Sequence, residues 1–463
     1  MAKKVILMIT TLLLVMTMLV QAVYSADANR DGYVDGFGEW NTTDTINMSY
    51  SQKYDDETKI DGGYIFEDGP EGISDSFFKN TKPGFIPDGI SINTKCSGRC
   101  FIEVPLDKGK VYEAAIYNWN HAQFDVRIGL GIHNLDNAKG SITIYKKATN
   151  TKSVIPKWTM EDAIESVSKR KNLYVRATHV ETMLAFLKAS NNTTKTTSVP
   201  AIGELNNQGS LDIMSDEIGT GECFDGRIRF KVNSSNMYAK VYCIKASEYK
   251  PKYIGYTMFL GDYKESMNTQ DPFDGNKRRY IQENNMTGLY KYVARDTTID
   301  GNDYFTLCGG TRNSTSAAAF YASNEYKPSD ENKSKIVPDT GYKYVYSTID
   351  NQCEKPVIDP YHGICPSTGI LGNYGIVYTL TSKSEANFFV IRNGIRPKDT
   401  KNTKEPKPRT DVVYYNGAWR TVTTQPYEEK FVPIDNSQIK FVLASGNGGF
   451  VDIKFLNMKI PLK

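Results

Sequence analysis

Apolar and polar residues alternate along several short stretches of this chain, as they do in strands that bury one face. Within 124–133, every second residue is aliphatic: Val126, Ile128, Leu130 and Ile132. The stretch 227–232 alternates in the same way, with basic residues on its other face, and 238–246 is expected to return beside it as a hairpin. A period of two predicts antiparallel sheets with one buried and one solvated face.

Further short strands are predicted at 140–145, 253–260, 303–308, 342–348, 374–381 and 387–391. Asn416-Gly417 between two alternating stretches predicts a hairpin with a type I′ turn, which this dipeptide favours. A second hairpin is predicted from 440–444 and 450–455, which a glycine-rich loop joins. Many short strands at regular spacing are typical of β-sandwiches.

Two helices are predicted between these strands. Thr159 and Asp162 resemble a capping box that opens a helix to about residue 168. Thr178 and Glu181 resemble a second capping box, and the helix that follows has an apolar stripe suited to packing on a sheet: Val180, Met183, Leu184 and Leu187. The expected fold is therefore mainly β, with antiparallel β-sandwich domains and two short inserted helices.

The first 25 residues predict a secretory signal peptide. Lys3 and Lys4 precede an apolar run at 5–20, and small residues follow before acidic sequence begins. An uncleaved anchor is the alternative, which the shortness of the run disfavours. Cleavage would leave Ala26 at the mature N-terminus and the rest of the chain outside the cell, without a membrane segment.

The mature chain is longer than one core usually organises, so two or three domains are expected. Composition and pattern divide it into a loop-rich N-terminal segment, a sandwich region with two helices, a second β-rich region, a linker and C-terminal hairpins. The predicted boundaries are 26–95, 96–250, 251–397, 398–411 and 412–463.

The charges are nearly balanced. The formal net charge is +3, and Lys3 and Lys4 account for two of these charges. A mixed surface of this kind gives no electrostatic reason to expect nucleic acid or anionic lipid as a partner.

Seven cysteines in an exported chain predict disulfides. Their spacing suggests three pairs and leaves Cys308 over: Cys96–Cys100, Cys223–Cys243 and Cys353–Cys365. For Cys96 and Cys100, two free thiols are the alternative. A zinc site is disfavoured, because CxxC pairs are absent and the sequence holds only four histidines.

An aspartate-rich loop at the start of the mature chain is the clearest candidate metal site. Oxygen ligands fall at the spacing of a calcium loop, with a carbonyl at the fourth of the five positions: Asp27, Asn29, Asp31, Tyr33 and Asp35. The position of the usual bidentate carboxylate is Gly38, with Glu39 one residue late, so an acidic turn without metal is the alternative. Calcium is the one cofactor that the sequence suggests.

Catalytic motifs are weak in this sequence. Neither GxSxG nor HExxH occurs, and Ser166 with Lys169 forms an isolated SxxK that an exposed helix face explains better. Paired carboxylates of a glycosidase leave no signature in sequence, because their separation is spatial. The sequence therefore favours a non-enzymatic role without settling it.

Four tryptophans are candidates for stacking on sugar rings: Trp40, Trp119, Trp158 and Trp419. Packing in the core or at a sheet edge is the alternative for each, and we favour it.

Three segments resemble a group of uncharacterised secreted β-rich cell-envelope proteins of endospore-forming Gram-positive bacteria. They are Ile116-Tyr-Asn-Trp-Asn120 with the strand ending at His133-Asn134-Leu135, the helix before Ser190, and Gly372-Asn-Tyr-Gly-Ile-Val-Tyr378. The resemblance covers roughly residues 100–395 and implies a β-sandwich protein associated with the cell envelope or matrix.

The sequence therefore suggests two functions. The first is a secreted structural, adhesive or surface-associated protein of the bacterial cell envelope, with a cell-wall or extracellular polysaccharide or a surface protein as partner. The alternative is an extracellular carbohydrate-binding protein or a secreted carbohydrate-active hydrolase.

The calcium hypothesis predicts that Ca²⁺ raises the melting temperature of the mature protein above its value in chelator, because a ligand of the folded state stabilises that state. Changing Asp31 to Ala should remove the difference. Melting curves that coincide with and without Ca²⁺ would eliminate the site.

Overall fold

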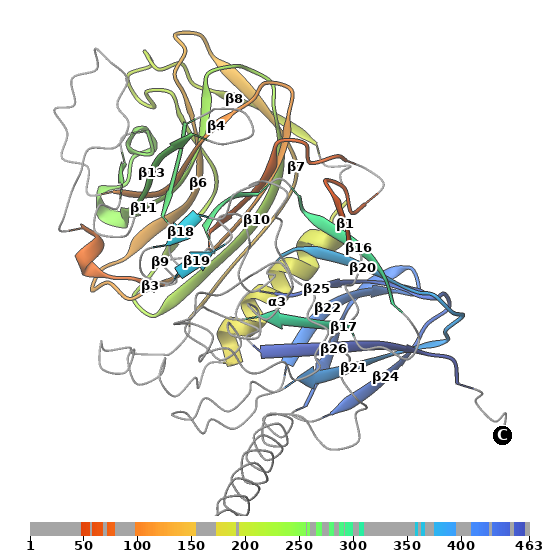
Figure 1. Cartoon of the computed structure of the whole chain (residues 1–463). Coiled ribbons are helices and arrows are strands. Elements are labelled where there is room, and N and C mark those ends of the chain that lie inside the picture. The colour runs from red at the N-terminus through yellow and green to blue at the C-terminus, as the bar shows by residue number, and fades with distance from the viewer. Residues whose placement is uncertain are drawn as a thin grey trace, which may run out of the picture.

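The computed structural model describes eighteen segments of the chain. They are 48–55, 58–67, 72–78, 98–153, 173–190, 194–255, 257–259, 265–270, 277–281, 287–290, 292–299, 305–309, 357–359, 363–365, 375–394, 409–425, 428–444 and 449–458. Within them the protein is mainly β and forms two sandwiches (Figure 1). No helix in these segments is long and apolar enough to cross a membrane.

The first sandwich has two seven-stranded sheets. One, which we call the junction sheet, has the order β15 (Thr287–Tyr290), β2 (Gly63–Glu67), β5 (Val111–Asn120), β10 (Glu222–Val232), β7 (Gly140–Ser153) and β8 (Lys195–Val199), with β3 (Gly72–Ile73) beside β5. The other, the outer sheet, has the order β13 (Glu265–Gln270), β14 (Lys277–Ile281), β4 (Arg99–Leu106), β11 (Met237–Lys245), β6 (Val126–Asn134) and β9 (Ser210–Ile218), with β12 (Met258–Phe259) beside β4.

The core of the first sandwich lies between these two sheets. Alternate aliphatic residues of both contribute to it, including Ile116, Ile128, Leu130, Ile228 and Val241. The expected inward face of 124–133 is confirmed, because each of its four aliphatic side chains is buried.

The second sandwich has a six-stranded and a four-stranded sheet. The larger has the order β1 (Met48–Ser51), β16 (Ala294–Ile299), β20 (Val377–Ser382), β25 (Gln438–Val442), β22 (Arg409–Tyr415) and β23 (Ala418–Thr424). The smaller has the order β17 (Phe305–Gly309), β26 (Gly449–Leu456), β21 (Phe388–Gly394) and β24 (Glu429–Pro433). A separate two-stranded sheet consists of β18 (Val357–Asp359) and β19 (Gly363–Cys365).

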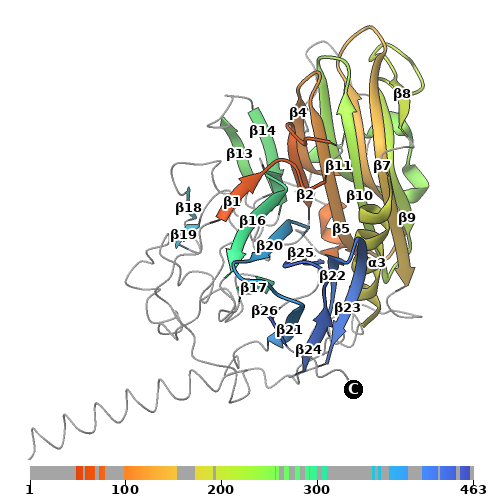
Figure 2. The same cartoon turned by 90° about the vertical axis from the view of Figure 1, so that its right-hand side faces the viewer.

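Helix α3 (Leu173–Lys188) lies between the two sandwiches, as both views show (Figures 1 and 2). It contacts β7 and β10 on one side and β22 and β23 on the other. Short 3-10 helices occur at η1 (Asp75–Phe78), η3 (Ala246–Glu248) and η4 (Pro251–Tyr253).

The predicted apolar stripe of this helix is confirmed, because Val180, Met183 and Leu187 are buried. Its predicted start is wrong. Thr178 and Glu181 lie inside the helix, which already begins at Leu173, so they do not form its N-cap. The helix predicted at 159–168 falls outside the described residues.

One of the three predicted hairpins is confirmed. Strands β22 and β23 pair across Asn416-Gly417, whose φ angles of 48° and 73° are those of a type I′ turn. The other two predictions are wrong, because β10 and β11 join different sheets and so do β25 and β26. A short turn can connect two strands within one sheet or lead the chain to the facing sheet. The strands alternate apolar and polar residues in both cases, so the sequence does not distinguish them.

The predicted domain boundaries do not match the sheets. Segment 26–95, expected to be loop-rich, supplies β1 to the second sandwich and β2 and β3 to the first. The boundary at 412 falls inside β22, which shares a sheet with β20. Hydrogen bonding between strands distant in sequence decides these boundaries, and local composition does not record it.

His133 is buried on the face of β6 that points away from the core. Its Nδ1 lies 3.2 Å from Ser210 Oγ, and Lys240, on the neighbouring strand, donates a 2.8 Å hydrogen bond to the Gly255 carbonyl. Burial first, and then the charge of Lys240, lower the pKa of His133 from 6.5 to about 3.

This lowered pKa predicts that acid destabilises the fold. Below pH 6.5 this histidine is protonated in the unfolded chain, whereas in the folded chain it stays neutral until about pH 3. The contribution of His133 to the free energy of unfolding is therefore fully present above pH 6.5. It falls as the pH drops, by about 2 kcal/mol at pH 5. Urea unfolding at pH 7 and pH 5 should show this extra loss in the native sequence relative to His133→Gln. Equal pH dependence in the two proteins would contradict it.

Candidate functional site

Glu113 is buried between two arginines on the side of the junction sheet that faces α3. The register places Glu113 of β5 opposite Arg229 of β10, two residues from Arg227. Arg227 donates from Nε (2.8 Å) and from Nη2 to Oε1, and Arg229 donates from Nε to Oε2 at 3.1 Å. The Tyr54 hydroxyl donates to Oε2 at 2.8 Å. The carboxylate therefore accepts four hydrogen bonds, three of them from charged groups.

Asp55 provides a second carboxylate to the same cluster. It accepts a 2.8 Å hydrogen bond from Arg229 Nη1 and lies 3.6 Å from Lys146 Nζ. A β-bulge opposite Arg229 and Phe230 places Lys146 on this side of β7. The Phe186 ring of α3 covers the cations, 5.1 Å from the Arg227 guanidinium and 4.7 Å from Lys146 Nζ. We call Tyr54, Asp55, Glu113, Lys146, Arg227 and Arg229 the junction cluster.

The charges of the cluster set its protonation. Burial alone would raise the pKa of Glu113, but Arg227 and Arg229 outweigh it and hold that pKa below its ordinary value. Burial opposes ionisation of Asp55 in the same way, and Arg229 again lowers its pKa. Burial and then Arg229 lower the pKa of Lys146. Both carboxylates are therefore ionised at neutral pH, as their hydrogen bonds require.

The sequence prediction of a solvated face at 227–232 is wrong for two residues. Arg227 and Arg229 have exposed fractions of 1% and 0%, because α3 and the second sandwich cover this side of β10. A second layer of protein buries both faces of the strand. The strand nevertheless alternates apolar and basic residues, as a strand with one solvated face does.

Polar contacts extend the cluster to the second sandwich. Arg227 Nη2 donates a 3.0 Å hydrogen bond to the carbonyl of Gly375, just before β20. Lys440 of β25 donates a 2.6 Å hydrogen bond to the carbonyl of Tyr54. Gly375 has a φ of 75°, and a Cβ there would collide with the Tyr64 hydroxyl, so this close approach requires glycine.

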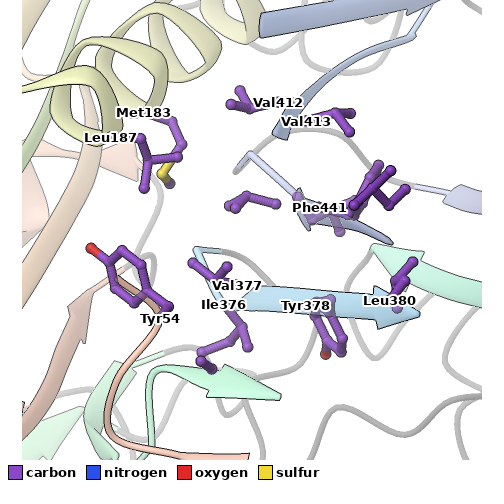
Figure 3. Close-up of a cluster of buried hydrophobic side chains, with 14 of the residues drawn as sticks. Tyr54, Met183, Leu187, Ile376, Val377, Tyr378, Leu380, Val412, Val413 and Phe441 are labelled. Carbon is purple, nitrogen blue, oxygen red and sulfur yellow. The ribbon is translucent and has the colours of Figure 1, made fainter. Parts of the chain in front are cut away.

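Apolar packing surrounds these contacts without a break. A single core cluster includes Tyr64 of the junction sheet, Phe186 of α3 and Phe441 of the second sandwich. In Figure 3, Met183 and Leu187 extend from α3 towards the strands of the second sandwich. One hydrophobic cluster therefore joins the helix-facing side of the junction sheet, α3 and the second sandwich, and it is separate from the core between the two sheets of the first sandwich.

A small cavity lies beside the cluster. Its lining includes His179 and Met183 of α3, Asp225 and Arg227 of β10, and Gly375. The volume open to the centre of a water molecule is about 10 Å³, which is about one water molecule and far below the size of a metabolite pocket. The arrangement can position charges and join structural layers, but it has no room for an organic substrate.

The tryptophans do not come together as a sugar-binding surface among the described residues. Trp119 is half-buried beside Tyr117, to whose hydroxyl its indole N–H donates, and Cys223. Trp419 is half-buried in the second sandwich, with its ring centroid 5.4 Å from that of Tyr414. The packing that we favoured from sequence holds for both. Trp40 and Trp158 lie outside the described residues.

The structure does not form the predicted Cys223–Cys243 disulfide. Both residues are buried and neither is in a disulfide: Cys223 lies in the junction sheet, and Cys243 lies in the core on a strand of the outer sheet. The pairing assumed that their strands form one hairpin, which they do not.

Cys100 is also a free, buried thiol, and its Sγ donates to the Ile102 carbonyl at 2.9 Å. Its proposed partner Cys96 lies outside the described residues. The same holds for Cys353, the proposed partner of Cys365, which ends β19.

The calcium loop also lies outside the described residues: Asp27, Asn29, Asp31, Tyr33 and Asp35. Within the described segments, no group of three or more His, Cys, Asp or Glu side chains could hold a metal ion. The calcium hypothesis therefore stays a prediction.

Sequence reasoning missed the junction cluster. The available signal was a glutamate inside an apolar run, Val111 to Ile116, together with two arginines on alternate positions of a second strand. A charge in a strand that is otherwise buried indicates a partner, because isolated buried charges are costly. The sequence does not say which strands pair, so the partner could not be named.

Comparisons with known proteins add little. No protein-family model matches the chain, and no curated protein matches it. Among solved structures, the CUB1-EGF-CUB2 domains of rat MASP-1 share 9% identity with it, over 76% of this chain and 93% of that one, with a TM-score of 0.16. Such a low TM-score carries no argument about fold or function. The resemblance to secreted cell-envelope proteins stays a prediction.

The geometry predicts that Glu113→Gln destabilises the protein by about 3 kcal/mol, because it leaves two buried arginines without their shared counter-charge. Chemical unfolding at pH 7 measures the loss. The control is Lys139→Gln, which removes an exposed ion pair to Glu204 with a separation of 3.6 Å and should cost less than about 1 kcal/mol. Similar losses in the two variants would contradict the role given to Glu113.

Proposed function

We propose that this chain is a secreted, non-enzymatic structural or adhesive protein of the bacterial cell envelope. The observation that carries the proposal is the junction cluster. Its six side chains come from the junction sheet and from the segment after β1, where the two sandwiches and α3 meet. A protein that displays or spaces a surface needs such a stiff join, whereas an enzyme gains more from an open cleft between domains.

The mainly β architecture supports this proposal. Sandwiches place loops and sheet edges at the surface and keep their hydrogen-bonded layers inside, which suits a protein that presents contacts to a partner. The N-terminal sequence supports export, because it has the basic, apolar and small-residue regions of a signal peptide.

Carbohydrate binding is the weaker proposal on this evidence. Stacking on sugar needs aromatic faces that lie open and close together. Trp119 and Trp419 belong to different sandwiches, and each is partly covered by neighbouring side chains.

A binding experiment on envelope fractions separates the two proposals. The mature chain is incubated with intact Gram-positive cells, with cells whose surface proteins have been removed by protease, and with purified peptidoglycan, chitin and cellulose. Of the two kinds of partner that the sequence leaves open for the structural or adhesive role, we propose the surface protein. We therefore expect retention on intact cells and much less on protease-treated cells.

Retention on any purified glycan would instead support carbohydrate binding. Absence of retention on all five surfaces would contradict both proposals. The Glu113→Gln variant is a useful control, since its binding should fall only under conditions in which unfolding is detected.

A further inference from the structure

We propose that the cavity beside the junction cluster is a binding site for one ordered water molecule, held by His179 and shared between α3, the junction sheet and the second sandwich. This proposal goes beyond the proposed function, because it concerns how the two sandwiches pack against α3 and does not depend on where the protein acts.

His179 supplies the first observation. It projects from α3 with an exposed fraction of 3%, and its Nδ1 lies 2.9 Å from Asp225 Oδ2. Its other ring nitrogen, Nε2, is buried and has no hydrogen-bond partner among the described residues. A buried ring nitrogen without a partner is costly, so a partner from solvent is expected.

The size and lining of the cavity are the second observation that points to a water molecule. About 10 Å³ is open to the centre of a water molecule, which fits one molecule and little else. Besides His179, the lining includes Thr182, Asp225 and Arg227, so the walls carry hydrogen-bonding groups among apolar ones. Buried waters typically have two to four such partners, whereas cavities that stay dry are apolar.

The charges around the cavity favour a neutral occupant. Arg227 disfavours a cation, and the carboxylate of Asp225 disfavours an anion. Water also suits His179 in either protonation state. In the neutral ring Nδ1 donates to Asp225 and Nε2 accepts, whereas in the charged ring both nitrogens donate. Water can donate or accept, so it completes the hydrogen bonding in both cases.

The site has a structural consequence. Its walls come from β2, β5 and β10 of the first sandwich, from α3, and from Gly375 just before β20. A water held here bridges all three layers at the point where Arg227 also reaches Gly375. The water molecule is therefore part of the interface between the two sandwiches and α3.

The test uses the full mature chain with isotope-labelled histidine. The sequence has four histidines, and the His179→Gln variant assigns the His179 ring signal by its loss. Water-selective NMR should show a cross-peak between a long-lived water and the His179 ring. A crystal structure should show density within hydrogen-bonding distance of Nε2.

Ala115 lines the cavity, so Ala115→Val fills it and should abolish the cross-peak. The matched control is Ala138→Val, at an exposed position, which should keep it. A cross-peak and density that are absent from the native protein would overturn the proposal, as would a cross-peak that persists unchanged in Ala115→Val.

Discussion

The ionised carboxylate of Glu113, enclosed by Arg227 and Arg229, constrains the structure around it. Removing such a group from water costs several kcal/mol, and only close charge-assisted hydrogen bonds offset this cost. Here both oxygens are occupied by donors, and the arginines reach on to Asp55 and to the Gly375 carbonyl. The ion pairs of Glu113 lie within the first sandwich, Tyr54 and the Gly375 carbonyl add hydrogen bonds from the segments of the second, and Phe186 of α3 covers the cations. The cluster therefore favours one arrangement of the three parts as well as stabilising it.

Apolar burial supplies the favourable free energy that the ion pairs alone would not. One hydrophobic cluster continues from the junction sheet through α3 into the second sandwich. Figure 3 shows its part between α3 and the second sandwich. Domain interfaces within a chain are usually polar enough to allow relative motion. This one resembles a domain core, and a core of this kind resists hinge motion. The proposed role in a cell envelope depends on that stiffness.

The features that could be predicted from sequence are those set by near neighbours. Asn416-Gly417 fixes its hairpin because the turn geometry is local, and the stripe of α3 follows from the period of a helix. The two failed hairpins and the buried Arg227 depend on layers supplied by distant segments. Arg227 reaches Gly375, 148 residues away, and no local pattern encodes that contact. The candidate site was missed for the same reason, since Glu113 signals a need for a partner without identifying one.

Cooperative unfolding tests the central claim most directly, that the two sandwiches form one body. Incorporation of fluorotryptophan gives ¹⁹F signals from Trp119 in the first sandwich and Trp419 in the second, each assigned by a Trp→Phe variant. As urea increases, both native signals should disappear at the same concentration, because the two sandwiches share a buried hydrophobic cluster and the hydrogen bonds from Arg227 to Gly375 and from Lys440 to Tyr54. If one signal persists well after the other has gone, the sandwiches unfold separately, and the account is contradicted.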